Sequence, residues 1–183
     1  MGRGGGVTLI IASLAVSLSI VTWSAGDPSL TFSTGGRVHN LLGSFGAIVS
    51  DLLLQILGFA TVPAMIAPLL WGIDLVTDER VAGYRTKAAL YPISLLALAG
   101  ALSGLTAPPS WPLHHGLGGI LGDVMFNAVA GIVAYVNPAR ADLVTLIVLA
   151  GSGLSALAAS VGIEPRHLEA ALWPARPRER PSG

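Results

Sequence analysis

The sequence predicts an all-α integral membrane protein, a bundle of four transmembrane helices with an extra outer-side helix and both termini in the cytoplasm. The chain is 52% hydrophobic and only 11% charged, whereas soluble domains carry about a quarter charged residues. Four long stretches contain no charged residue: Val7–Trp23, Leu52–Ile73, Ala88–Ser110 and Leu143–Ile163. A helix needs about 20 apolar residues to cross about 30 Å of hydrocarbon, so each stretch is long enough to span a bilayer.

Charge and cysteine content exclude some functions. The formal net charge is zero, which argues against direct nucleic-acid binding by this segment. The chain has no cysteine, so it forms neither disulfides nor thiolate metal sites.

The first span, about 7–23, is interpreted as a retained helix and not as a cleaved signal peptide. Its apolar run is longer than a usual signal core, and Trp23 stands two residues before Ala25, where a small side chain is needed for cleavage. Turn-forming residues in GDPS and TGG then predict an external loop over Ser24–Ser44.

The second span, about 46–73, carries polar residues on one side. Helical spacing places Ala47, Asp51, Gln55 and Gly58 on one face, and small and polar residues on such a face permit close approach and interhelical hydrogen bonds. Asp51 follows the outer loop by one or two turns, which favours a structural carboxylate near the outer interface. A proton-relay or transport carboxylate, the alternative, is expected near mid-bilayer.

The third span, about 88–105, follows a short charged cytoplasmic hairpin. It contains Gly100-x-x-x-Gly104, and small residues at this spacing are typical of helix contacts in membranes. Similar patterns occur in the first and last spans: Ser13-x-x-x-Ser17 and Gly151-x-x-x-Ser155-x-x-x-Ala159. These patterns fit packing within one bundle or an interface between subunits.

Charge asymmetry decides whether the apolar stretch 116–136 also crosses. Lys and Arg accumulate on the cytoplasmic side of short loops. If 116–136 crosses, the basic residues divide five to five between the two sides; if it does not cross, they divide eight to two, with only Arg37 and Arg140 outside. The sequence therefore predicts four spans, with 116–136 as a re-entrant or interfacial half-helix on the outer side.

The half-helix and the remaining segments carry further candidate residues. Gly118, Gly119 and Gly122 permit close packing against the bundle, and Asp123 and Asn127 share one face. We expect that face to line an aqueous or intra-bundle surface. The last span is predicted at about 141–163, and the Pro/Arg-rich tail 164–183 has the composition of a cytoplasmic linker.

Catalytic and metal-binding patterns are weak. His114-His115 has no nearby third ligand in the sequence, so an exposed loop pair is the interpretation. GSGLS lies within an apolar helix with no histidine in any span to act as a base. The single lysine, Lys87, does not follow a phosphate-binding glycine loop. The sequence predicts no catalytic residue, cofactor site or metal site in this segment.

The order of several short motifs closely resembles the N-terminal four-helix membrane domain of the FtsK/SpoIIIE DNA translocases. The resemblance runs from about Val7 to Ile163. The positions that carry it are Asp27-Pro28-Ser29, Asn40, Gly43, Gly46-Ala47, Asp51, Gly58, Gly118-Gly119 and Gly122.

The resemblance implies the function of a membrane anchor for an ATP-driven DNA pump. Family members are hexameric and act in cell division and chromosome segregation at the septum of the bacterial inner membrane. Their membrane domain contacts lipid and other division proteins, and a Pro-rich linker joins it to the motor. ATP and magnesium are implied only for that motor, which this chain lacks, so the segment is expected to be a localisation and assembly module.

Two other functions fit parts of the sequence. A small transporter or channel subunit could use Asp51 and Asp123, because buried carboxylates and broken helices mark ion paths. Against it, the carboxylates are predicted to be shallow, and no internal repeat is expected between the halves. The other alternative is a free-standing membrane adaptor that ends at Gly183.

Overall fold

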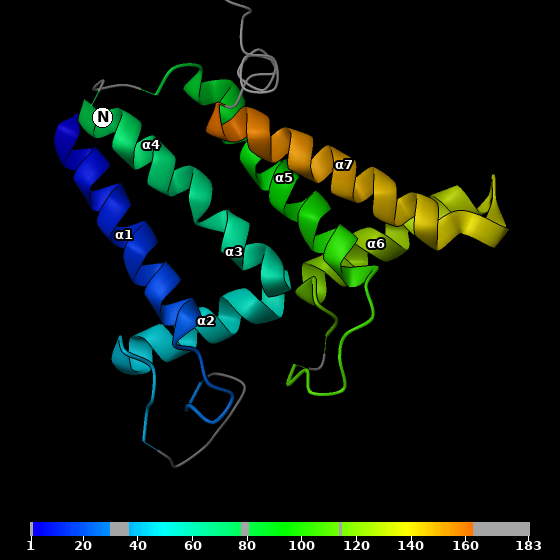
Figure 1. Ribbon diagram of the computed structural model, residues 1–183, viewed down its shortest axis with the longest axis horizontal. Coiled ribbons are helices and arrows are strands. Elements are labelled where there is room, and N and C mark those ends of the chain that lie inside the picture. The colour runs from blue at the N-terminus through cyan, green and yellow to red at the C-terminus, as the bar shows by residue number, and fades with distance from the viewer. Residues whose placement is uncertain (1, 30–36, 78–80, 114, 163–183) are drawn as a thin grey trace, which may run out of the picture.

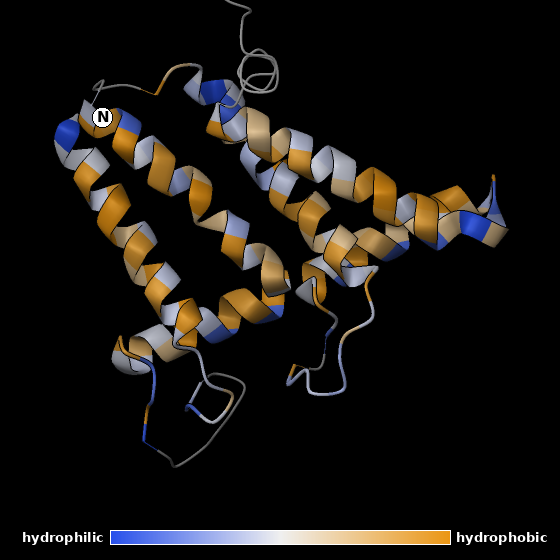
Figure 2. Cartoon of the chain, viewed as in Figure 1, coloured by the Kyte–Doolittle hydropathy of each residue, from blue (hydrophilic) through white to orange (hydrophobic). Residues whose placement is uncertain are grey.

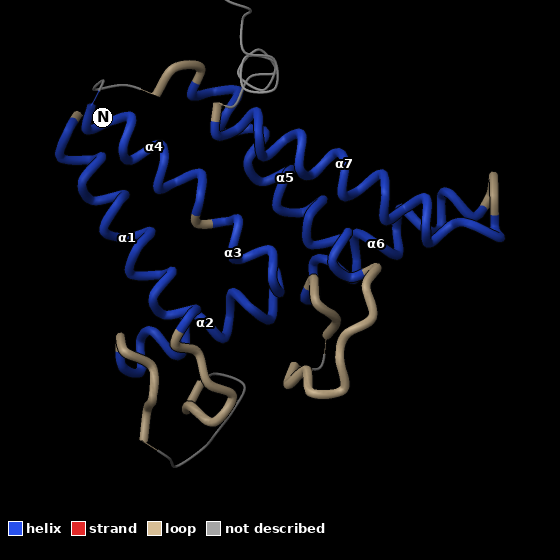
Figure 3. Tube along the Cα trace, in the orientation of Figure 1, coloured by secondary structure: helices blue, strands red, loops and turns tan. Residues whose placement is uncertain are grey.

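The computed structural model describes residues 2–29, 37–77, 81–113 and 115–162. Within these ranges every regular element is helical (Figure 3). The elements are α1 (Arg3–Val21), α2 (Gly43–Leu57), the 3₁₀ turn η1 (Gly58–Ala60), α3 (Thr61–Ala64), α4 (Ile66–Thr77), α5 (Tyr84–Ser103), α6 (Gly119–Ala134), the 3₁₀ turn η2 (Pro138–Arg140) and α7 (Ala141–Val161).

Four helical stretches are long and apolar enough to cross a membrane: Arg3–Val21, Gly43–Ala64, Tyr84–Ser103 and Pro138–Val161. Figure 2 shows apolar colours along most of the helices and polar colours near several helix ends. The prediction of an all-α chain with four membrane-spanning stretches is confirmed.

The helices form two packed pairs, α1 with α4 and α5 with α7 (Figure 1). Glycine allows close approach in both pairs. A Cβ atom on Gly6 of α1 would lie 2.7 Å from the carbonyl oxygen of Gly72 in α4. A Cβ atom on Gly153 of α7 would lie 2.9 Å from the side chain of Leu98 in α5. In lipid the hydrophobic effect does not drive helices together, so close packing of this kind is a main source of helix association.

In both helix pairs the first helix begins, and the second helix ends, at the same end of the molecule. The start of α1 contacts the end of α4, and Asp74 of α4 lies 3.7 Å from Lys87 at the start of α5. A Cβ atom on Gly162, just after α7, would lie 2.9 Å from Lys87 Nζ. These four helix ends therefore lie at one end of the molecule, and the loops after α1 and α5 lie at the other, the loop end (Figure 1).

Helix α6 stays at the loop end of the molecule. It begins against the end of α5, where a Cβ atom on Gly122 would contact the carbonyl oxygen of Ala99. It leads into α7, whose Leu146 lies 3.0 Å from where a Cβ atom on Gly104 of α5 would be. Helix α6 runs away from the end of α5, and α7 returns from the far end of α6 to pack beside α5 (Figure 1). Within α6 the chain therefore does not run back along α5.

The stretch predicted as the second span, about 46–73, is divided into several helical elements in the structure. The chain leaves helical geometry at Gly58, which has φ 57° and ψ −138°. Helix α2 lies across the loop end of α1, and α3 and α4 return beside α1 (Figure 1). The stretch Gly43–Ala64, which is apolar and long enough to cross a membrane, therefore bends at Gly58, and its α2 part does not run along α1. A positive φ costs glycine little, and Pro63 in α3 supplies no N–H to a helical hydrogen bond. Both residues favour a division of this stretch.

Candidate functional site at the loop end of the helices

A buried carboxylate, Asp27, organises the loop between α1 and α2. Its side chain is 2% exposed. Its Oδ1 accepts the backbone N–H of His39 at 2.8 Å and lies 3.0 Å from His39 Nδ1. Its Oδ2 accepts the backbone N–H of Asn40 at 2.9 Å. One carboxylate thus fixes two consecutive residues of the segment that leads into α2.

The same hydrogen bonds set the charge state of Asp27. Burial raises the pKa of this carboxyl group, but the hydrogen bonds from His39 and Asn40 outweigh burial, and the net pKa lies below the usual value of 3.8. Asp27 is therefore ionised at neutral pH. A charged acceptor strengthens each hydrogen bond that it receives.

Asn40 continues this arrangement toward α1 and α2. Its Nδ2 donates to the carbonyl oxygen of Ser19 near the end of α1, at 2.8 Å. Its Oδ1 accepts the N–H of Leu42 at 3.0 Å and would meet any Cβ atom placed on Gly46. Asp27, Asn40 and Gly46 form a single polar junction, which we call the first-loop cluster.

Asp51 lies on the buried face of α2, which also includes Ala47 and Leu54. It is 2% exposed, and its Oδ2 accepts Gln55 Nε2 at 2.9 Å. Gln55 is half-buried. The arrangement matches a carboxylate that is held by protein hydrogen bonds at the loop end of the molecule.

A second polar cluster joins α5 to α6. Asp123 Oδ1 accepts the hydroxyl of Ser103 at 2.7 Å, and Asp123 Oδ2 lies 3.2 Å from His115 Nδ1. The carbonyl oxygen of His115 accepts Trp111 Nε1 at 2.8 Å. We call this group the second-loop cluster; it fixes the chain before α6 as Asp27 fixes the chain before α2.

Glycines join the end of α2 to the start of α6. A Cβ atom on Gly58 would overlap the carbonyl oxygen of Leu117, and one on Gly119 would lie 2.7 Å from Gly58 N. The N–H of Phe59 donates to the carbonyl oxygen of Leu117 at 2.8 Å. A Cβ atom on Gly118 would overlap the carbonyl oxygen of Ala99. The end of α2, the start of α6 and the end of α5 therefore meet backbone to backbone.

Other candidate residues have different surroundings. Gly100 packs against Met125 and Leu149, and Gly104 packs against Phe126. Four other candidates are exposed: Asn127 on α6, and Gly151, Ser155 and Ala159 on α7. On α7 the glycine that packs closely within the bundle is therefore Gly153, which contacts Leu98, and not Gly151 of the predicted small-residue pattern. Ser13 of the first-span pattern is buried. His114 and the tail 164–183 lie outside the described residues.

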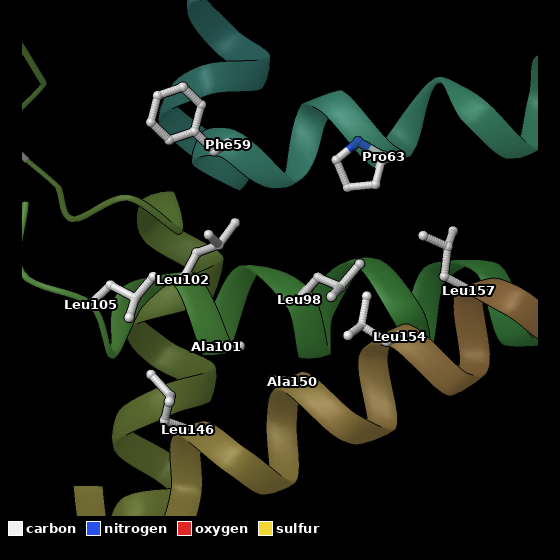
Figure 4. Close-up of a pocket in the computed structure, with 10 residues that line it drawn as sticks. All are labelled: Phe59, Pro63, Leu98, Ala101, Leu102, Leu105, Leu146, Ala150, Leu154 and Leu157. Carbon is white, nitrogen blue, oxygen red and sulfur yellow. The ribbon is translucent and has the colours of Figure 1, made fainter. Parts of the chain in front are cut away.

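An apolar groove of about 370 Å³ separates the two helix pairs (Figure 4). Phe59 and Pro63 form one wall, and leucines from α5 and α7 form the other. All ten lining residues are apolar, so the groove matches hydrocarbon and offers no group for chemistry. Among the residues that the structure describes, no three His, Asp or Glu side chains are grouped to hold a metal ion.

Comparison with known proteins shows the family to which the chain belongs. A family model described as "4TM region of DNA translocase FtsK/SpoIIIE" matches residues 4–163. The chain belongs to this family. Most positions that carried the resemblance in the FtsK/SpoIIIE family lie in the contacts just described: Asp27, Asn40, Gly46, Asp51, Gly58, Gly118, Gly119 and Gly122.

The curated relatives are much longer than this chain. "DNA translocase FtsK" of Caulobacter vibrioides is 33% identical over 187 residues, which cover 98% of this chain and 23% of that protein. The protein of the same name from Mesorhizobium japonicum is 32% identical over 155 residues, 84% of this chain and 17% of that protein. No solved structure matches the chain significantly. The chain thus corresponds to the membrane region of FtsK and does not cover the motor.

Sequence reasoning did not identify the partners of these carboxylates. His39 and His115 each approach an aspartate through Nδ1, yet Asp27 and His39 are separated by a long loop. The only sequence signal was the presence of Asp27 and Asn40 among the family positions.

Proposed function

We propose that this segment is the membrane anchor and the localisation and assembly module of a septal DNA translocase that acts in cell division and chromosome segregation. The single observation that supports this most is the match of residues 4–163 to the membrane region of FtsK/SpoIIIE. Four membrane-spanning stretches supply the anchor. Its partners would be inner-membrane lipid, other division proteins and further copies of the translocase, and its work requires no nucleotide or metal cofactor.

The polar clusters support contacts outside the membrane on the loop side. Asp27 and Asp123 fix the described residues that lead into α2 and α6, so these parts of the two loops have a defined conformation. Ordered loops lose less conformational entropy when they bind a partner. We therefore assign recognition of division proteins to the loop end, and membrane anchoring to the helix pairs.

A fluorescent protein fused after Gly183 tests this proposal in dividing bacteria. The fusion should concentrate at midcell, while the same fluorescent protein on an unrelated four-span anchor stays uniform in the membrane. A matched variant, Asp27→Asn, should reduce the midcell signal more than Asp142→Asn, whose carboxylate is exposed at the start of α7. Uniform membrane fluorescence of the unmodified fusion throughout the cell cycle would contradict the localisation role.

Purified segment 1–183 provides a second test. It should neither hydrolyse ATP nor bind DNA at physiological salt, because only scattered arginines are present to displace counterions from DNA. Binding that persists at physiological salt would assign a DNA contact to the membrane domain.

A further inference from the structure

The structure contains an internal repeat that the sequence analysis did not expect. In each half, a long helix leads through a loop into a helix at the loop end, and the chain then returns beside the long helix. The first unit is α1, α2, α3 and α4, and the second is α5, α6 and α7. One constant sequence separation relates His39 to His115, Gly43 to Gly119 and Gly46 to Gly122.

The start of the loop-end helix has the same backbone geometry in both units. The residue before the helix has φ −92° and ψ 17° at Leu42, and φ −93° and ψ −1° at Gly118. The first helical residue has φ 65° at Gly43 and 67° at Gly119. Each of these glycines donates its N–H to the carbonyl oxygen three residues earlier, at 2.9 and 3.0 Å. The chain thus builds the same turn twice.

The two units meet head to tail. The end of the first unit's loop-end helix contacts the start of the second unit's loop-end helix, through the Phe59 N–H to Leu117 hydrogen bond of 2.8 Å. The Phe59 ring lies 4.8 Å from that of Trp111 in the second loop. A Cβ atom on Gly119 would lie 2.6 Å from the carbonyl oxygen of Gln55. Both units have their connecting loop at the loop end of the molecule, so the contact between them also lies at that end (Figure 1).

The contact between the units uses the end of α2 and the start of α6. The corresponding surfaces at the start of α2 and the end of α6 have no partner of this kind among the described residues. At the start of α2, a Cβ atom on Gly43 would meet nothing within 4 Å, although its counterpart Gly119 is crowded. Leu41 is 69% exposed and Phe45 is 77% exposed there. At the end of α6, Tyr135 is 94% exposed and Val136 is 88% exposed. Tyr135 is related to Phe59 by the same sequence separation, and Leu41 is related in the same way to Leu117.

We propose that a second copy of this chain docks head to tail, with the end of α6 of one copy against the start of α2 of the next. Tyr135 and Val136 would cover Leu41 and Phe45 of the neighbouring copy. Repeat proteins add units through the interface that already joins neighbouring units. The two surfaces belong to the corresponding helices α2 and α6 of the two units, so rotation of a copy about the membrane normal is the operation that would bring them together.

The contact between copies differs from the internal one in one respect. Ala134 stands in the place of Gly58, and α6 continues into a turn in which Tyr135 N donates to the carbonyl oxygen of Ile132 at 3.3 Å. The contact between copies therefore uses the Tyr135 and Val136 side chains, where the internal contact uses the backbone of Phe59. The interface is heterologous, and repeated addition generates a ring or an open array.

Cysteine cross-linking of the full chain in membranes tests the proposal, and the chain has no cysteine of its own. One copy carries Tyr135→Cys and one epitope tag, and the other carries Leu41→Cys and a different tag. A short bis-maleimide should give a product with the mass of two chains that contains both tags. The positive control is Phe59→Cys with Leu117→Cys in one chain, which should cross-link within that chain.

Three results would overturn the head-to-tail contact. The first is an absent Tyr135→Cys to Leu41→Cys product while the Phe59→Cys and Leu117→Cys control reacts, which would leave these surfaces to lipid. The second is an equal yield when Val124→Cys, which is 63% exposed on α6, replaces Tyr135→Cys. The third is a stronger product from Tyr135→Cys alone, which would indicate a two-fold contact. None of these results depends on localisation at midcell.

Discussion

Replacing Asp27 by asparagine should destabilise the first-loop cluster measurably. Oδ1 of Asp27 accepts the backbone N–H of His39 at 2.8 Å, and Oδ2 accepts the backbone N–H of Asn40 at 2.9 Å. In Asp27→Asn one of these oxygens becomes an NH₂ group, so in either amide orientation at least one donor faces another donor. The remaining hydrogen bonds also lose their charged acceptor. An unsatisfied buried donor costs about 1–3 kcal/mol and loss of the charge adds to it, so we expect a total of about 2–4 kcal/mol.

Thermal unfolding of segment 1–183 in detergent, followed by tryptophan fluorescence, measures this loss. At about 2–4 °C per kcal/mol for a chain of this size, Tm should fall by about 4–16 °C. Asp142→Asn is the matched control, because Asp142 is exposed, and its Tm should stay within about 2 °C of the unmodified chain. If Asp27→Asn unfolds together with Asp142→Asn, the carboxylate does not hold the loop and the reasoning is refuted.

Three further predictions follow from the same contacts. Gly58→Ala should cost at least about 2 kcal/mol, since φ is 57° and the new methyl group would overlap Leu117; Gly151→Ala, with nothing within 4 Å, should be neutral or slightly stabilising. Asp51→Asn should keep the fold, because an amide oxygen still accepts Gln55 Nε2, whereas Asp51→Leu should lower Tm; proton flux in liposomes that Asp51→Asn abolishes would favour a transporter instead. Because the pKa of Asp27 is lowered from 3.8, its stabilisation is present above that pH and is lost as pH falls through the folded-state pKa. Tm of the unmodified chain should therefore fall more steeply than that of Asp27→Asn during acidification below about pH 4.

Composition predicted the helices well because a bilayer demands long apolar segments with internally satisfied backbones. The apolar stretch of the third span corresponds to α5, and the charge-free stretch Leu143–Ile163 corresponds to α7. A separate helix over 116–136 was also expected, and its bounds in the structure are Gly119–Ala134. Hydropathy averages over many residues and is insensitive to single positions.

The turn at Gly58 and the internal repeat were not expected from the sequence, because each depends on a few individual residues. Hydropathy does not distinguish a continuous helix over 46–73 from two helices that turn at Gly58, because both are equally apolar. The internal repeat was missed for a related reason: only a few residues, such as the pairs Gly43–Gly119 and Gly46–Gly122, are shared between the units. The turn depends on backbone dihedral angles at those glycines, which different neighbouring side chains permit.

Cysteine accessibility tests whether the chain crosses the membrane four times with α2 and α6 at the outer side. Single cysteines at Ser33, Val81, Ser110, Val136 and Ser182 would be exposed to an impermeant thiol reagent in cells with a permeabilised outer membrane. We expect labelling at Ser33, Ser110 and Val136 before lysis, and at Val81 and Ser182 only after the inner membrane is opened. Labelling at Ser182 before lysis, with Val136 protected, would mean that α6 crosses the membrane and that the chain has five spans.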